Sequence, residues 1–98
     1  MDKVELISVS EIVSIEADKG YTVFKTMHFK TFISSKQFST FEFIIEKFSF
    51  FVKVSRGIFI NLNYVKNYSK GEYCVTRMIN NEDFDISRRK KAEILSIL

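Results

Sequence analysis

The 98 residues predict one mainly β domain with a central amphipathic helix and a short C-terminal helix. Two observations predict this class. Short runs rich in Val, Ile, Phe and Tyr alternate with turn residues along most of the chain, as is typical of strands. Apolar residues at helical spacing occur only near the middle and at the end of the chain. The length suits a single core, so we expect residues 1–98 to form one domain.

The strands expected before the first helix are rich in β-branched and aromatic residues and cover residues 4–9, 12–17, 21–26 and 30–34. Turn signals follow the second and third runs, at Asp18-Lys19-Gly20 and Met27-His28-Phe29. Gly20 can adopt the positive φ that such a turn requires. In the third run the side chains alternate between two faces, one with Thr22, Phe24 and Thr26 and the other with Tyr21, Val23 and Lys25.

The period of the apolar residues changes after this strand. One helical stripe then carries Phe38, Phe41, Ile44, Ile45 and Phe48. The stripe predicts an amphipathic helix over about residues 37–48, with Ser35 or Ser39 as its N-cap. We expect this Phe-rich face to pack on the sheet rather than to bind a ligand.

Short strands resume after the helix and are expected at residues 51–54, 58–60, 64–68, 73–78 and 84–86. Polar segments at residues 55–57, 69–72 and 80–83 separate them, and the last two are typical of hairpin turns. The apolar residues of the final segment predict a short helix over residues 88–98. Cys74, within a strand, is expected to be a small core residue.

The sequence offers little for catalysis, and we expect no enzymatic activity, metal or cofactor. His28 is the only histidine and lies in an expected turn without a neighbouring nucleophile. One Cys and one His provide none of the spacings of a metal site. The three glycines are isolated, so there is no phosphate-binding loop.

Sorting signals are also missing from the 98 residues. No apolar run approaches the roughly 20 residues that span a bilayer, and the first residues do not have the pattern of a signal peptide. Cys74 has no second cysteine to pair with, which fits a reducing cytoplasm. We therefore expect a cytoplasmic protein without a membrane partner.

Three polar, basic segments interrupt the apolar strands, at residues 18–21, 53–57 and 87–90. The net charge is only +3, and the one dense basic run covers residues 88–91. Arginine suits nucleic-acid binding because its planar fork can grip a phosphate or the edge of a guanine with two hydrogen bonds. Taken by composition alone, the segments fit ordinary solvated loops as well as a DNA-binding surface.

Three stretches together resemble the LytTR family of bacterial DNA-binding domains: SEIVSIEADKGYTVFKT (residues 10–26), FFVKVSRGIFINLNYV (residues 50–65) and FDISRRKK (residues 84–91). The middle stretch is the most specific, with Phe51, Arg56 and a closing Asn61 in the family's order. It departs from the pattern where Lys53 and Ser55 replace the usual Arg and His, and where Gly57 replaces a Ser. Ser55 reaches less far than a His, so a contact at this point would shift to Arg56.

The resemblance implies an elongated antiparallel β domain whose loops enter successive major grooves of DNA. It implies base or groove contacts by Tyr21, Arg56 and Arg88. It implies contacts to the DNA backbone by Lys19, Lys53, Ser55, Ser87, Arg89 and Lys90. Asn61 closes a strand and is expected to satisfy loop backbone groups instead.

The leading hypothesis is therefore sequence-specific binding of double-stranded DNA for transcription regulation, as the output module of a bacterial response regulator. Few loop contacts per domain favour repeated half-sites and a homodimer on DNA. No receiver segment precedes the module in these residues, so it is expected to be free-standing or part of a longer regulator. The alternative is a protein-interaction module that keeps the fold without binding DNA and recruits its partner at a strand edge.

Overall fold

The computed structural model describes residues 6–69 and 74–97. Its elements, in chain order, are η1 (Val9–Glu11), β1 (Ile12–Asp18), β2 (Tyr21–Thr26), β3 (Thr31–Ser34), α1 (Phe38–Ile45), β4 (Phe51–Ser55), β5 (Ile58–Asn61), η2 (Leu62–Tyr64), β6 (Val65–Tyr68), β7 (Cys74–Met78), β8 (Asp83–Ile86) and α2 (Arg88–Ile97), where η marks a 3-10 helix. The mainly β class with two α-helices is thereby confirmed.

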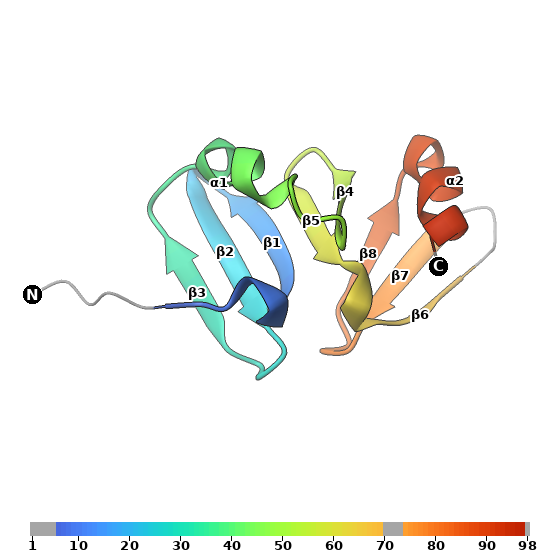
Figure 1. Ribbon diagram of the computed structural model, residues 1–98, viewed down its shortest axis with the longest axis horizontal. Helices are drawn as coiled ribbons and strands as arrows, with labels where there is room; N and C mark the ends of the chain where they lie inside the picture. Colours follow the sequence, from blue (N-terminus) through green and yellow to red (C-terminus); the bar gives the residue numbers. More distant parts are fainter. Residues whose placement is uncertain (1–5, 70–73, 98) are drawn as a thin grey trace, which may run out of the picture.

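The strands form two antiparallel sheets that lie end to end along the molecule (Figure 1). The first sheet has five strands in the order β3-β2-β1-β5-β4, and the second has three in the order β6-β7-β8. The long axis measures 49 Å against 24 and 23 Å for the other two. The elongated shape that the family resemblance implied is therefore present.

One core fills the space between α1 and the first sheet. Its fully buried members include Ile15 of β1, Phe59 of β5 and Ile45 of α1. The ring of Phe41 meets Phe24 edge-on at 4.9 Å, and Phe38 stacks on Phe59 at 5.4 Å. Such aromatic pairs contribute about 0.5–1.5 kcal/mol each beyond the area they bury. The expected packing of the Phe-rich helix on the sheet is therefore confirmed.

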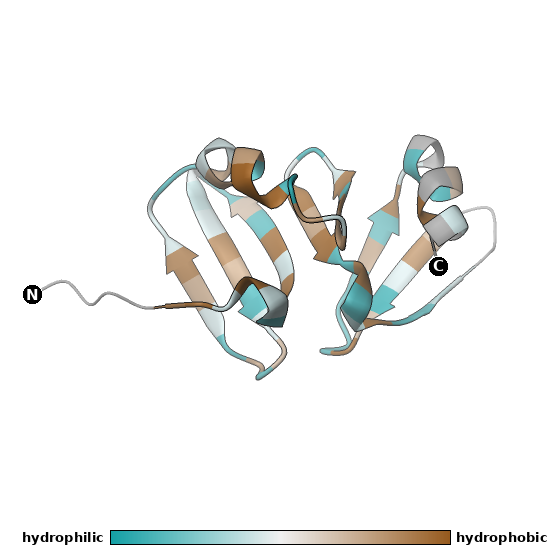
Figure 2. Ribbon diagram, in the orientation of Figure 1, coloured by the Kyte–Doolittle hydropathy of each residue, from teal (hydrophilic) through white to brown (hydrophobic). Residues whose placement is uncertain are grey.

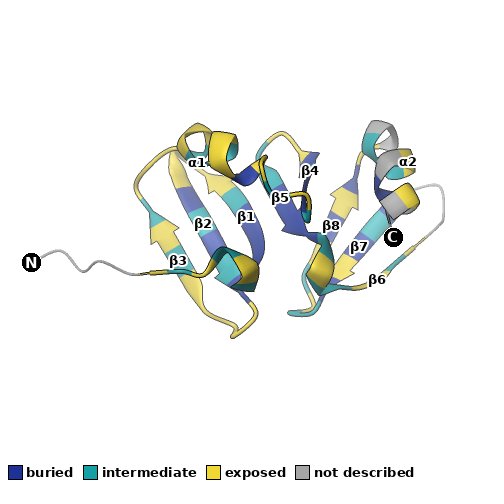
Figure 3. Cartoon of the chain, in the orientation of Figure 1, coloured by how far each residue is buried: buried dark blue, intermediate teal, exposed yellow. Residues whose placement is uncertain are grey.

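A second core lies between the two sheets. It combines Val13, Val52, Val54 and Ile60 of the first sheet with Cys74, Met78, Phe84 and Ile86 of the second and Ile94 of α2. Figure 3 shows the buried residues gathered on β1, β4, β5 and β8, where the sheets meet. Hydrophobic and hydrophilic residues alternate along the strands in Figure 2, as expected for strands with one covered face. Cys74 is a buried free thiol, as predicted.

The strand predicted over residues 4–9 is wrong for its described part. Residues 6–8 have no regular structure, and Val9–Glu11 forms a 3-10 turn closed by the Glu11 amide and the Ser8 carbonyl at 3.0 Å. Serine side chains favour such local bonding over a strand ladder, and the hydroxyls of Ser8 and Ser10 bond each other at 3.0 Å. Residues 4 and 5 lie outside the described residues.

The central helix is shorter than predicted and begins without a serine cap. Gln37 occupies the N-cap position and makes no side-chain capping bond. Two hydrogen bonds to the residue before Gln37 explain this start. The Thr22 hydroxyl donates to the Lys36 carbonyl at 2.8 Å, and the Lys36 amide donates to the Ser34 hydroxyl at 3.2 Å. Ile44, expected in the core, is half exposed because it borders an open groove beside β3.

The remaining strand predictions agree with the structure to within one or two residues. The two-faced pattern of β2 is confirmed, since Thr22, Phe24 and Thr26 are buried. The turn after β1 uses positive φ at Lys19 and Gly20, and that after β7 uses positive φ at Asn81. Residues 70–73 of the predicted first hairpin turn lie outside the described residues, although β6 and β7 pair antiparallel.

Candidate nucleic-acid interface

Three polar turns meet along one edge of the molecule, which we call the loop edge. It comprises Lys19–Tyr21 between β1 and β2, Ser55–Gly57 between β4 and β5, and Ser87 with the first turn of α2. β1 and β5 run antiparallel with Glu16 opposite Ile58, so the end of β1 lies beside the start of β5. In Figure 1 the β4–β5 turn and the start of α2 both lie at the upper side of the molecule.

The first turn presents an aromatic side chain to solvent. Lys19 and Gly20 have φ values of 48° and 88° and form a tight turn. Tyr21 follows this turn as the first residue of β2. Tyr21 is 52% exposed and Lys19 is exposed. Both predicted contact residues of this turn are therefore accessible.

The second turn is held against the first by a close backbone approach. The Ala17 amide donates to the Gly57 carbonyl at 2.8 Å. A Cβ at position 57 would lie 3.0 Å from the Cβ of Ala17, so glycine permits this approach. The register of β4 on β5 shifts between Lys53 and Ser55, which is the irregularity of a β-bulge. Ser55 and Arg56, next to the bulge, are exposed.

The third segment is a helix start rather than a loop. Ser87 precedes α2, and its carbonyl accepts from the amides of Lys90 and Lys91 at 3.0 and 2.9 Å. Arg88–Lys90 form the first turn of α2, in agreement with the helix predicted over residues 88–98. The side chains of Arg88 and Arg89 lie outside the described part of the structure. Free amides at a helix N-terminus favour anions, which adds a small positive contribution here.

The second and third segments share a small cavity of about 220 Å³. Most of its lining comes from predicted DNA-contact residues, namely Lys53, Ser55, Arg56, Ser87 and Lys90, with Val54 at its base. Residues more than thirty positions apart in sequence are therefore neighbours on the surface. Hydroxyls and cations around one concavity are groups that can bind an oxyanion such as a phosphate.

Lys53 does not point freely into solvent. Its Nζ lies 2.8 Å from Oε1 of Glu42 on α1, and both side chains are about one-third exposed, at 33% and 29%. The ion pair compensates part of the Lys53 charge close to the loop edge. The predicted phosphate contact by Lys53 would compete with this carboxylate.

Ion pairs elsewhere in the molecule shift the pKa values of Lys25, Arg77 and Asp83. Partial burial alone would lower the pKa of Lys25, but the hydrogen bonds and charges of Glu82 and Glu16 outweigh it and raise that pKa. On the second sheet, Arg77 holds Asp83 through bonds of 2.8 and 3.1 Å. This hydrogen bonding lowers the pKa of the Asp83 carboxyl. Neither pair belongs to the loop edge.

The described residues contain neither a metal-binding cluster nor a membrane-spanning helix. No three His, Cys, Asp or Glu side chains of residues 6–69 and 74–97 gather so that they could hold a metal ion. Within the same residues, no helix has the length and apolar character needed to cross a membrane.

Sequence reasoning missed two residues near the loop edge. Glu42 has no sequence signal, because its pairing with Lys53 arises only when α1 packs beside β4. Lys91 belonged to the recognised basic run of residues 88–91 but was given no role, although its amide helps to close the first turn of α2. Asn61 is fully buried and bonds backbone groups, which confirms its structural role.

The comparisons with known proteins point in one direction. The family model of the LytTr DNA-binding domain matches residues 2–98. A solved structure, the LytTr DNA-binding domain of a protein described as a methyl-accepting/DNA response regulator from Bacillus cereus, superposes with a TM-score of 0.75. It is 18% identical in sequence, and the match covers 93% of this chain and 84% of that one. No curated protein sequence matches the chain significantly.

Proposed function

The chain belongs to the LytTr DNA-binding domain family, and from this premise we propose that it binds double-stranded DNA sequence-specifically through the loop edge. DNA binding for transcription regulation is the family's function. The finer proposal concerns which surface binds and which residues read the bases. One observation carries it: three segments from separate parts of the sequence converge on one edge, where Lys19, Tyr21, Ser55, Arg56 and Ser87 are exposed.

The division of labour on the loop edge follows from side-chain chemistry. Arg56, exposed at the tip of the central turn, has the fork that suits a guanine edge, and Arg88 is proposed for the same role at the third segment. Tyr21 contributes a hydroxyl and an aromatic face to the groove. The backbone contacts proposed for Lys19, Lys53, Ser55, Ser87, Arg89 and Lys90 provide affinity and register rather than choice of sequence.

One domain offers few base contacts, so we propose that it acts on repeated half-sites, as a homodimer on DNA. Pairing two modest interactions raises the overall affinity without new contacts, provided that both half-sites can be engaged together. We also propose a response-regulator context and a cytoplasmic location, in keeping with the free thiol of Cys74.

Selection from a random duplex pool tests the proposal. We expect the wild type to enrich one sequence and Arg56→Ala to lose preference at one base position, at a cost of about 1–3 kcal/mol. Lys90→Ala should weaken binding to all sequences alike and flatten the dependence on salt. The matched control for Lys90→Ala is Lys30→Ala. Lys30 follows the end of β2 that is opposite to the Tyr21 turn, so this variant should bind DNA almost as the wild type does. Wild-type selectivity in Arg56→Ala would refute the assigned base contact.

The alternative, a protein-interaction module, is favoured by a different surface. An apolar groove of about 670 Å³ runs between α1 and the edge strand β3, and Ile33 and Ile44 beside it are 68% and 52% exposed. An open strand edge can accept a partner strand. Fluorescence titration with random-sequence duplex at low salt separates the two functions: no binding at micromolar protein would favour the interaction module.

A further inference from the structure

A polar network joins the two sheets on the side away from the loop edge. Lys25 of β2 donates to Oε2 of Glu82, in the turn between β7 and β8, at 2.7 Å. The same Nζ lies 3.0 Å from Glu16 of β1. The Lys25 side chain is 24% exposed and that of Glu82 is 36% exposed, so the pair between the sheets is only partly shielded from water.

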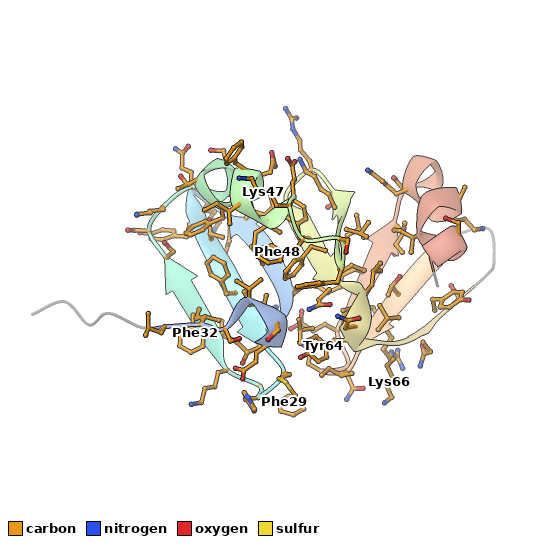
Figure 4. The ribbon with its side chains drawn as sticks, in the orientation of Figure 1. Phe29, Phe32, Lys47, Phe48, Tyr64 and Lys66 are labelled. Carbon is orange, nitrogen blue, oxygen red and sulfur yellow. The ribbon has the colours of Figure 1, made fainter. Side chains whose placement is uncertain are left out.

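A second bond joins η1, which precedes the first sheet, to η2, which leads into the second sheet. The hydroxyl of Tyr64, at the end of η2, donates to the carbonyl of Ser10 in η1 at 2.7 Å, and Met27 Sδ lies 3.2 Å from it. Figure 4 shows Tyr64 between the first sheet and the strands of the second. We call the Lys25–Glu82 and Tyr64–Ser10 bonds the inter-sheet latch.

Three hydrogen bonds fix the turn that carries Glu82. The Glu82 carbonyl accepts from the Met78 amide at 2.9 Å, and the Glu82 amide donates to Oδ1 of Asn80 at 3.2 Å. The Ile79 amide donates to the Tyr64 carbonyl at 3.0 Å, which ties this turn to η2. The backbone of Glu82 is therefore tied to the end of β7, and the turn is tied to η2.

The latch and the loop edge lie at opposite ends of the same strands. β2 begins at Tyr21 of the loop edge and reaches Lys25 four residues later, about 13 Å away. β8 begins after the Glu82 turn and ends before Ser87. Between the two ends lies the apolar core shared by both sheets. Apolar contacts are non-directional, whereas hydrogen-bonded ion pairs specify an orientation.

We propose that the inter-sheet latch positions the two sheets so that the Tyr21 turn and the start of α2 meet DNA at a fixed spacing. This inference rests on the proposed function. Lys25, Glu82 and Tyr64 are positioning residues and do not touch the DNA. Groups that act together must be held to within about 0.5 Å of their working geometry, and a core without a directional tie does not ensure this across two sheets.

The experiment compares two duplexes. The base contacted at each end of the loop edge is first identified from the position at which Tyr21→Ala or Arg88→Ala loses its base preference. One duplex carries the sequence selected by the wild type. The other carries the same sequence with one base pair inserted between those two positions. The measured quantity is the ratio of the two affinities. For the wild type we expect a ratio of about tenfold or more, the order of one lost base contact. For Glu82→Gln we expect this ratio to fall about fivefold, the order of a modest ion pair.

Asp83→Asn is the matched control. It removes a carboxylate from the residue next to Glu82, but its partner Arg77 belongs to the same sheet. Asp83→Asn should therefore keep the wild-type ratio, whereas Tyr64→Phe, which deletes the other bond of the latch, should lower the ratio as Glu82→Gln does. Urea unfolding of each variant shows whether it is folded under the binding conditions.

The outcomes separate the two claims. A structural role alone would weaken binding to both duplexes equally, so an unchanged ratio in Glu82→Gln and Tyr64→Phe overturns the latch while the proposed function stands. An equal fall in Asp83→Asn also overturns it, since the effect would then come from charge alone. A wild type that selects no sequence overturns the proposed function, and the latch proposal with it.

Discussion

The side-chain amide of Asn61 satisfies two backbone groups at the end of β5. Its Nδ2 donates to the Ile12 carbonyl at 2.9 Å, and its Oδ1 accepts from the Asn63 amide at 2.9 Å, capping η2. Asn61 is fully buried and its bond to the Ile12 carbonyl is buried, so this carbonyl depends on the Asn61 amide for a donor. One amide thus connects β1 to the chain that crosses to the second sheet.

Asn61→Ala should lower the free energy of unfolding by about 2–4 kcal/mol, because it removes a cap and leaves a buried carbonyl without a donor. Urea denaturation measures the change. Asn63→Ala removes an exposed amide two residues away and should stay within about 0.5 kcal/mol of the wild type. A loss in Asn61→Ala no larger than in this control would show that the two bonds contribute little.

Gly57 is the residue whose size decides how closely two turns of the loop edge approach. Gly57→Ala would place its Cβ 3.0 Å from that of Ala17. We expect a loss of about 1–3 kcal/mol in unfolding free energy, as for an overpacked site. Ala17→Gly removes the opposing methyl, so the double variant should lose less than the sum of the single losses. Strict additivity in urea denaturation would contradict the contact.

At the scale of the element, α1 bears on the loop edge through one ion pair. Glu42 forms an ion pair with Lys53 and so compensates part of the positive charge that the central turn could present to DNA. The helix packs through its Phe-rich face, so this pair is not needed to keep it in place. Its position instead tunes the charge next to the Arg56 turn.

Glu42→Gln should tighten DNA binding by about two- to fivefold at low salt and steepen the dependence on salt, because Lys53 becomes available to a phosphate. A salt series of binding titrations checks this. Glu46→Gln removes the same charge from an exposed position at the end of α1 and should have a smaller effect. Equal effects of the two variants would indicate only a general change in net charge.

At the scale of the whole molecule, the second of the two cores is built jointly by both sheets. Strands β4 and β5 hydrogen-bond within the first sheet but pack Val52, Val54 and Ile60 against β7, β8 and α2, while Phe51 and Phe59 face the core under α1. Neither sheet can therefore lose its structure without exposing apolar surface of the other. That residues 1–98 form a single domain stays a prediction, and the core built by both sheets offers a way to test it.

Ile60, fully buried in this shared core, provides a test of cooperativity. Ile60→Ala should lower the free energy of unfolding by about 2–5 kcal/mol. Hydrogen exchange of amides in both sheets and tyrosine fluorescence should then show the same single urea transition. Ile33→Ala, at a 68% exposed position of β3, should change stability by less than about 0.5 kcal/mol. Separate transitions for the two sheets would contradict the single domain.

Much of the fold could be predicted because local physics decides it. The alternation of Thr22, Phe24 and Thr26 sets the buried face of β2, and Gly20 sets the turn before it. Predictions were wrong where a local pattern had competing outcomes. The apolar run before residue 10 packs against the core but forms a 3-10 turn and does not pair as a strand. The start of α1 is set by hydrogen bonds of the Lys36 backbone with Thr22 and Ser34.

The sequence by itself determined the mainly β class, most strand positions and the three polar segments, because composition and period are local properties. The family resemblance on those segments named the DNA-contact residues. Only the tertiary structure decided that the segments share one edge, that Glu42 faces Lys53 and that Lys25 reaches Glu82. Lys25 and Glu82 are 57 positions apart. Such pairings depend on how two sheets pack around a common core, and no spacing within the chain encodes that geometry.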